Sequence, residues 1–247
     1  MRNAIDTDVA EKFVEMGNEY AEHEQCNLAL LAYNEVIRRY YNKLPDVYYR
    51  RGLVYKALEK YHLARDDFDE AIRLGVKHAE IYFHRACLLR ICMRGIPQLA
   101  LMDFDKAIRL NPDYMEAYYE RGILRYEELN YWGAIEDFTK VIDSKPEDDL
   151  YNKRGIAYSE TFQLDKAIAD YTYIINRNEY ERMHIIHYNR ALTYERINQN
   201  ELAIQDYTDV LKIKPDYDNA LSARFDLYKR MGQHQKAQDS LKEITSD

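Results

Sequence analysis

The sequence has little that would suit a protein that binds nucleic acid or spans a membrane. Its 247 residues include 35 Lys and Arg against 43 Asp and Glu, which gives a formal net charge of −8. This sign is wrong for a surface that neutralises phosphates. No apolar run approaches the roughly 18 residues that a membrane helix needs, and the first residues lack the apolar core of a secretory signal. We therefore expect a soluble, cytoplasmic protein that binds neither nucleic acid nor a membrane.

The sequence is also poor in cysteine and in the motifs of catalytic and metal sites. Its three cysteines, Cys26, Cys87 and Cys92, are odd in number and lie among helix-forming residues, which argues against a disulfide framework or a paired metal site. His184 and His187 lie three residues apart, yet no nearby carboxylate or thiolate completes a metal set. There is no G-x-S-x-G, H-E-x-x-H or glycine-rich phosphate loop. These absences predict a protein without cofactor, metal or catalytic site.

One phrase of nine residues recurs along the chain. It reads VYYRRGLVY at 47–55, YYERGILRY at 118–126, LYNKRGIAY at 150–158 and IHYNRALTY at 186–194. The phrase contains an arginine followed directly by a small residue, glycine or alanine. Equivalent small residues recur along the chain at Gly17, Gly52, Ala86, Gly122, Gly155 and Ala191, and Phe225 occupies the last site. Successive sites are 33 to 36 residues apart, and such a fixed period indicates a repeat protein.

Two further positions keep the same register. An alanine follows the small site by 12 residues in every repeat but the third, where the interval is 14, and a ring or large apolar residue comes four positions later. Small residues on two successive helices let their backbones approach closely. Pro112, Pro146 and Pro215 would end the second helix of three repeats. The pattern therefore predicts helical hairpins that stack on one another.

This arrangement resembles the tetratricopeptide repeat, a helix–turn–helix unit of about 34 residues. The resemblance covers nearly the whole chain and implies an all-α fold, a right-handed α-solenoid of about seven repeats. We expect an N-terminal extension at 1–9 and a single repeat domain at 10–247. The repeats are expected at about 10–44, 45–78, 79–114, 115–147, 148–183, 184–217 and 218–247.

An arginine precedes the small site in every repeat after the first, where the family usually has leucine. The five middle repeats also carry an aspartate just before the ring of the second helix. These residues are Arg51 with Asp67, Arg85 with Asp103, Arg121 with Asp137, Arg154 with Asp170, and Arg190 with Asp206. We interpret them as ion pairs that bridge two helices of one repeat or of neighbouring repeats. The alternative is a row of arginines that binds acidic ligands.

In a solenoid of this kind the first helix of each repeat lines a concave groove. The register of this chain places an aromatic and aliphatic stripe there in repeats two to four. The candidate groove residues are Asn18, Tyr49, Arg50, Leu53, Phe83, His84, Cys87, Tyr119, Ile123, Asn152, Tyr188 and Asn189. Such a stripe suits a peptide or helix with apolar anchors. The alternative is that these rings only pack against adjacent helices.

The resemblance implies a non-catalytic scaffold or adaptor whose groove binds a peptide or helical segment of another protein. A second hypothesis is self-assembly into a homo-oligomer. One subgroup of the family grips the terminal carboxylate of heat-shock chaperones with five lysine, asparagine and arginine positions, of which the first three repeats match one, at Asn18. A chaperone-tail clamp is therefore the least favoured of these functions.

Overall fold

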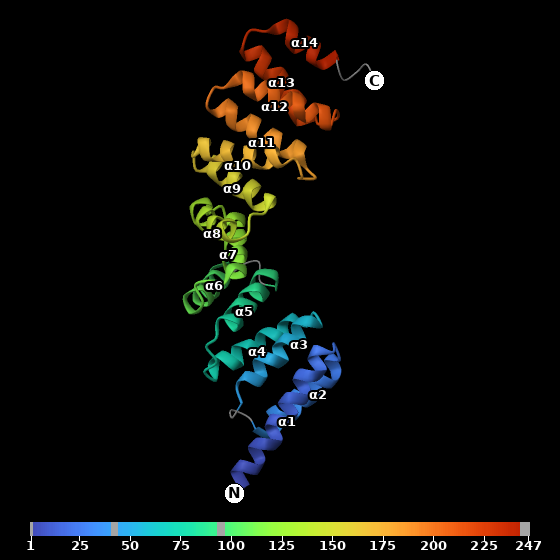
Figure 1. The fold of residues 1–247 in the computed structure, drawn as a ribbon, viewed down its shortest axis with the longest axis vertical. Coiled ribbons are helices and arrows are strands. Elements are labelled where there is room, and N and C mark those ends of the chain that lie inside the picture. The colour runs from blue at the N-terminus through green and yellow to red at the C-terminus, as the bar shows by residue number, and fades with distance from the viewer. Residues whose placement is uncertain (1, 41–43, 93–96, 243–247) are drawn as a thin grey trace. The chain divides into compact units, whose positions relative to one another are not determined.

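The structure is a computed structural model that describes residues 2–40, 44–92 and 97–242. Within these ranges every regular element is an α-helix, so the predicted all-α helical-repeat fold is confirmed (Figure 1). The helices fall into two compact units, 1–124 and 125–247, which we describe separately. The prediction of one continuous repeat domain from residue 10 to 247 stays a prediction.

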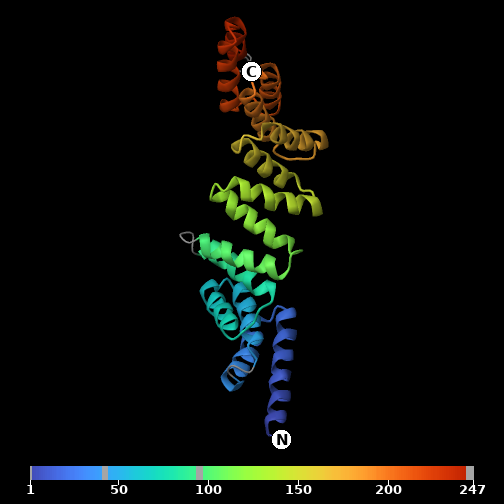
Figure 2. The same ribbon diagram turned by 90° about the vertical axis from the view of Figure 1, so that its left-hand side faces the viewer.

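The first unit holds three helical hairpins and most of a seventh helix (Figure 1; Figure 2). Its helices are α1 (Arg2–Glu22), α2 (Cys26–Tyr40), α3 (Asp46–Ala57), α4 (Tyr61–Arg73), α5 (Ala79–Cys92), α6 (Pro97–Leu110) and α7 (Met115–Glu127), of which α7 crosses the boundary between the units. Residues 2–9, which the sequence analysis assigns to an N-terminal extension, form the first turns of α1.

The second unit continues the same alternation. Its helices are the end of α7 and α8 (Tyr131–Ser144), α9 (Asp148–Glu160), α10 (Leu164–Arg177), α11 (Met183–Arg196), α12 (Asn200–Ile213), α13 (Asp218–Arg230) and α14 (His234–Lys242). Helices α6, α8 and α12 each end two residues before a proline, as predicted from Pro112, Pro146 and Pro215. In the described parts of the chain, no helix is both long and apolar enough to cross a membrane.

The core consists of the small residues and rings that set the repeat. Phe68 and Phe104 are fully buried in the first unit, and Tyr171 and Tyr207 in the second. A Cβ placed on Gly52 would lie 2.6 Å from Cε1 of Phe68, closer than carbon atoms approach without a shift. Glycine at this site is therefore required by the ring on the partner helix, which confirms the predicted close approach of the two helices.

Four of the predicted Arg–Asp pairs are confirmed inside the units. In each pair the guanidinium donates two hydrogen bonds to the carboxylate, in the geometry that suits arginine best. The two distances are 2.8 and 2.6 Å for Arg51–Asp67, 2.7 and 2.7 Å for Arg85–Asp103, 2.9 and 2.7 Å for Arg154–Asp170, and 2.7 and 2.8 Å for Arg190–Asp206. Arg121 with Asp137 joins residues of different units and stays a prediction.

The remaining guanidinium nitrogen reaches the preceding repeat, which the sequence analysis did not foresee. The acceptors follow the aspartate position of that repeat by two residues. The contacts of Nη1 are Arg51 with Asn34 at 2.6 Å, Arg85 with Asp69 at 2.7 Å, Arg121 with Asp105 at 2.6 Å, Arg154 with Thr139 at 3.1 Å, Arg190 with Thr172 at 3.0 Å and Arg224 with Thr208 at 3.2 Å. Each fully formed clamp thus joins three helices, and the arginines serve the architecture.

Candidate functional site

The predicted groove residues all lie on odd-numbered helices, which we call A helices because each opens a hairpin; the even-numbered helices are B helices. They are Asn18 in α1, Tyr49, Arg50 and Leu53 in α3, Phe83, His84 and Cys87 in α5, Tyr119 and Ile123 in α7, Asn152 in α9, and Tyr188 and Asn189 in α11. All are partly buried, neither sealed in the core nor fully exposed. Residues up to Ile123 belong to the first unit, and the last three belong to the second.

In the first unit, side chains connect each A helix to the next. The contacts are Arg50 Nη1 to Asn18 Oδ1 at 3.1 Å, Lys56 Nζ to His84 Nδ1 at 3.1 Å, and Arg90 Nη2 to Glu120 Oε2 at 2.9 Å. These residues therefore share one surface, which we call the first A-helix face. The structure brings most of the predicted residues of this unit to that surface or beside it.

The rings of the first A-helix face also touch the core. The ring centre of Tyr49 lies 5.9 Å from that of Phe68, and the ring centre of Phe83 lies 6.1 Å from that of Phe104 and 4.8 Å from that of Tyr114. Such tilted arrangements are favourable beyond simple burial. Tyr49 and Phe83 are thus held rigidly by the repeat while part of each side chain remains accessible.

Three ionisable groups of this face, Tyr49, His84 and Cys87, are neutral near pH 7. Burial raises the pKa of Tyr49 to about 12 and the pKa of Cys87 to about 12. Burial and the neighbouring ammonium of Lys56 lower the pKa of His84 to about 4, so its neutral Nδ1 accepts a hydrogen bond from Lys56. A protonated thiol is a poor nucleophile, so Cys87 is unsuited to catalysis or redox chemistry here.

The depressed pKa of His84 predicts a loss of stability in weak acid. The unfolded chain binds a proton at an ordinary histidine pKa near 6.5, whereas the folded chain binds it only near 4. The stabilisation is complete above pH 6.5 and is lost as the pH falls toward 4, by about 2–3 kcal/mol. Urea unfolding followed by circular dichroism will show this slope in the wild type and a flatter one in His84→Phe. Identical slopes in the two proteins would refute the assignment.

The second unit has an equivalent surface, the second A-helix face. Its cross-helix contacts are Asn189 Nδ2 to Asn152 Oδ1 at 3.2 Å, Arg196 Nη1 to Ser159 Oγ at 2.8 Å, and an ion pair between Arg230 and Glu195. Tyr188 packs its ring against Tyr207 and Tyr217, with ring centres 5.8 and 5.3 Å away. The predicted pair Asn152 and Asn189 is therefore brought together, whereas Tyr188 is braced by its neighbours.

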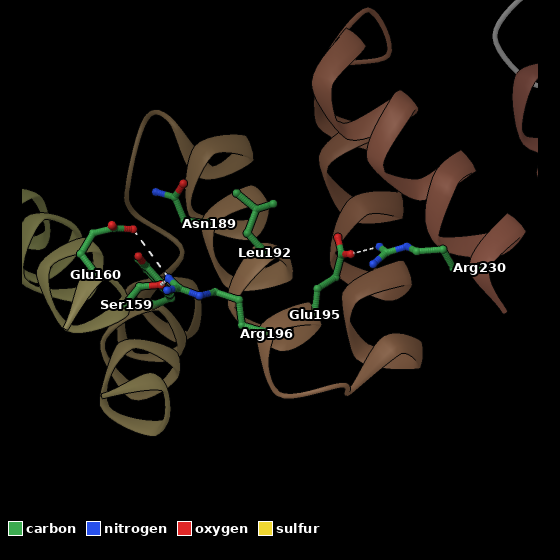
Figure 3. Close-up of a pocket in the computed structure, with 8 residues that line it drawn as sticks. Ser159, Glu160, Asn189, Leu192, Glu195, Arg196 and Arg230 are labelled. Carbon is green, nitrogen blue, oxygen red and sulfur yellow. Dashed lines mark hydrogen bonds and ion pairs between the residues drawn. The ribbon is translucent and has the colours of Figure 1, made fainter. Parts of the chain in front are cut away.

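A pocket of about 450 Å³ opens on the second A-helix face (Figure 3). Glu160 and Ser159 stand on one side, Leu192 and Asn189 in the middle, and Arg230 on the other side. The two arginines of the pocket, Arg196 and Arg230, are each paired with a glutamate of the same pocket, Glu160 and Glu195. The pocket thus combines one apolar side chain, an amide and internally neutralised charges.

Of the candidate groove residues, only Asn189 lines this pocket, although Leu192 has the same register position as Leu53 and Ile123, directly after the small site. Helical spacing was the signal for Arg196, which lies seven residues after Asn189 and so shares its face. Glu195 and Arg230 offered no such signal, because their pairing depends on how α11 packs beside α13.

One cluster has the composition of a metal site. Ligand atoms of His187, Asp206 and Asp209 lie within 4.8 Å of one another. Both carboxylate oxygens of Asp206 already accept hydrogen bonds from Arg190, and His187 Nδ1 lies 2.8 Å from one of them. Burial acts to raise the pKa of Asp206, but the bonds from Arg190 and His187 outweigh it and hold that pKa below its usual range. The guanidinium therefore takes the place that a cation would need.

The fold and the cross-helix surfaces define a helical-repeat protein. The family model for the tetratricopeptide repeat matches residues 45–74 and 185–217, which are α3 with α4 and α11 with α12. These two hairpins are therefore tetratricopeptide repeats, as predicted for them from the sequence. A comparison with curated proteins finds no match.

Solved structures of low sequence identity share the fold. The MamA protein is 22% identical with a TM-score of 0.61, over 70% of this chain and 93% of that chain. The C-terminal part of a repeat protein from Cytophaga hutchinsonii is 19% identical with a TM-score of 0.67, over 93% of each chain. YrrB, described as a tetratricopeptide-repeat protein with an unusual peptide-binding site, is 22% identical with a TM-score of 0.53, over 90% of this chain and 96% of that chain.

Proposed function

We propose that this chain is a non-catalytic interaction scaffold that binds a peptide or helical segment of another protein on its A-helix faces. The observation that supports the proposal is the set of contacts between successive A helices, because within each unit they join partly accessible side chains of neighbouring A helices. An extended or helical segment can lie across such a surface and touch several repeats at once.

In the first unit the proposed contact surface centres on Tyr49, Phe83 and Tyr119, with Leu53 and Ile123 beside them. The rings are braced from behind, and the side chains of His84 and Cys87 beside them are neutral. Rigid aromatic anchors bind at a small cost in side-chain entropy. A ligand with apolar anchors therefore suits this surface better than an ionic one.

In the second unit, Asn152 and Asn189 would bind the polar backbone of the ligand, and the pocket around Leu192 would take a small apolar side chain. Each asparagine still has amide or carbonyl capacity beyond the single bond that joins them. The fold that this chain shares with YrrB is compatible with peptide binding. Self-assembly is the second candidate, with the ligand segment supplied by another copy.

The proposal is tested by affinity capture from native lysate. The variant Tyr49→Ala, Phe83→Ala, Tyr119→Ala is expected to lose a partner that the wild type retains, because aromatic anchors dominate such interfaces. The matched control replaces three exposed apolar residues on B helices of the same unit, Leu31, Met102 and Leu110, with alanine. Circular dichroism must first show that both variants fold.

Because Tyr49 and Phe83 touch the core, a second variant tests the same surface at Leu53; this residue also packs against the core, so circular dichroism must show that this variant folds too. Leu53→Glu adds a charge to the same surface without removing a ring, and it should abolish the same capture. Equal capture by wild type, triple variant and Leu53→Glu would refute the assignment of the site to the first A-helix face. Sedimentation at several concentrations identifies self-assembly, which would appear as a mass that rises with concentration.

A further inference from the structure

Two large apolar residues occupy strained positions at turns of the second unit. Six A helices, α1, α3, α7, α9, α11 and α13, are each followed two residues after their end by a residue of positive φ; the turn after α5 lies outside the described residues. Glycine adopts this left-handed conformation most easily. This site holds Glu24, Glu59, Leu129, Phe162, Asn198 and Gly232. Leu129 and Phe162 have φ of 60° and 59°, and their exposed fractions are 69% and 77%. Neither side chain is buried within the chain, and neither residue has a relaxed backbone. This combination favours a role in contact with another molecule.

The only tryptophan of the chain belongs to the same turn as Leu129, and Phe162 occupies the equivalent turn of the next stacked repeat. Trp132 follows Leu129 by three residues in the first turn of α8, and its exposed fraction is 62%. The equivalent positions in the next two repeats are Asp165 and Glu201, which is what an exposed first helical turn favours. We call Leu129, Trp132 and Phe162 the turn patch, and all three belong to the second unit.

The side chains around the turn patch are acidic. Glu127, Glu128 and Glu136 are exposed beside Leu129 and Trp132, and Glu160 and Asp165 are exposed beside Phe162. The one exposed basic residue in segments 126–136 and 160–166 is Lys166. Arg196 stacks 4.7 Å above the ring of Phe162, but its guanidinium is already held by Ser159 and Glu160. The rim of the patch therefore carries more acidic than basic side chains.

We propose that the turn patch docks a cationic amphipathic segment of a partner protein, with apolar residues over Leu129, Trp132 and Phe162 and with Lys or Arg facing the acidic rim. Opposite charge at the rim raises the association rate and the specificity for a cationic partner. Burial of the apolar side chains supplies most of the affinity. A second copy of this patch would bring like charges together, and an anionic membrane would be repelled in the same way. This surface lies on the turns and is separate from the proposed ligand site on the A-helix faces, although Glu160 and Arg196 border both.

Trp132 supplies the readout, since its fluorescence emission shifts to shorter wavelength when water is displaced from the ring. The probe is a synthetic helical peptide of Leu and Lys in amphipathic order, compared with a Leu/Glu peptide of the same pattern and a Ser/Lys peptide of the same charge. We expect saturable binding with an emission shift for the Leu/Lys peptide, and at least about tenfold weaker binding for the other two. Added salt should weaken the Leu/Lys complex.

The variant Leu129→Asn, Phe162→Asn tests the residues without harming the fold. Asparagine already occupies the same turn site at position 198, so the unfolding midpoint should stay equal or rise. Affinity for the Leu/Lys peptide should fall at least about tenfold, whereas the control Leu31→Asn, an equally exposed site in the first unit, should leave it unchanged. Equal affinity for the Leu/Lys and Leu/Glu peptides, a loss as large in Leu31→Asn, or binding without an emission shift would overturn the proposal.

Discussion

Asp170→Ala is expected to lower the free energy of unfolding by about 3–5 kcal/mol, because it leaves Arg154 as a buried charge without its bidentate partner. The side chains of Arg154 and Asp170 are only 12% and 7% exposed. Burial acts to lower the pKa of Arg154 and raises the pKa of Asp170, while the hydrogen bonds between them oppose both effects. The pair is thus needed mainly to offset the desolvation of its own charges.

The double variant Arg154→Leu, Asp170→Leu is expected to be much less damaging than Asp170→Ala alone, since it removes both buried charges together. Thr139→Ala removes only the neutral acceptor of Arg154 Nη1 and should lower stability by about 0.5–1.5 kcal/mol. Urea unfolding followed by circular dichroism measures all three. If Asp170→Ala were no less stable than the double variant, the clamp would not be a compensated buried charge.

Phe68→Ala is expected to lower the free energy of unfolding by about 3–5 kcal/mol, because this ring is completely buried between α3 and α4 and its loss leaves a cavity. The ring also explains the small residue opposite it. Gly52→Ala alone should be destabilising by about 1–3 kcal/mol, since its new Cβ would overlap Cε1 and Cδ1 of Phe68 at 2.6 and 2.8 Å.

The combination of the two changes should be much less damaging than the sum of the two single changes. Without the ring the overlap with Phe68 disappears, and only the contact of 3.2 Å between the new Cβ and the backbone oxygen of Ala64 remains. Alanine is also a better helix former than glycine by about 1 kcal/mol, so Gly52→Ala should cost clearly less in the Phe68→Ala background. Thermal and urea unfolding of the four proteins form a double-mutant cycle. Simple additivity would contradict direct contact between the two sites.

The fold was largely predictable from sequence because its determinants recur at one period. The small residues, the buried rings and the Arg–Asp pairs each appear several times. A chance match in one repeat can therefore be distinguished from a pattern that all repeats share. The second bond of each arginine was missed because its acceptors differ, from Asn34 through Asp69 to Thr172, and share no single residue type. The division at 124 and 125 has no marker in composition, since it falls inside α7.

The candidate site was predictable only in part. Helical register placed Tyr49, Phe83 and Asn189 on A helices, because a period of 3.6 residues fixes which side chains share a face. Register alone gives no information on how deeply a ring is packed, so the contacts of Tyr49 with Phe68 required the structure. The turn patch was not predicted, because the sequence does not give the backbone φ of Leu129 and Phe162 or the exposed fractions of the three side chains.

The most direct test of the central claim is site-specific photo-cross-linking from the two surfaces of the first unit. A photoreactive amino acid is placed at Leu53, on the A-helix face, or at Leu31, on the exposed side of a B helix. We expect the captured partner to become covalently joined at position 53 and not at position 31. Cross-linking at position 31 alone would place the partner on the B helices and would contradict the assignment of function to the A-helix face.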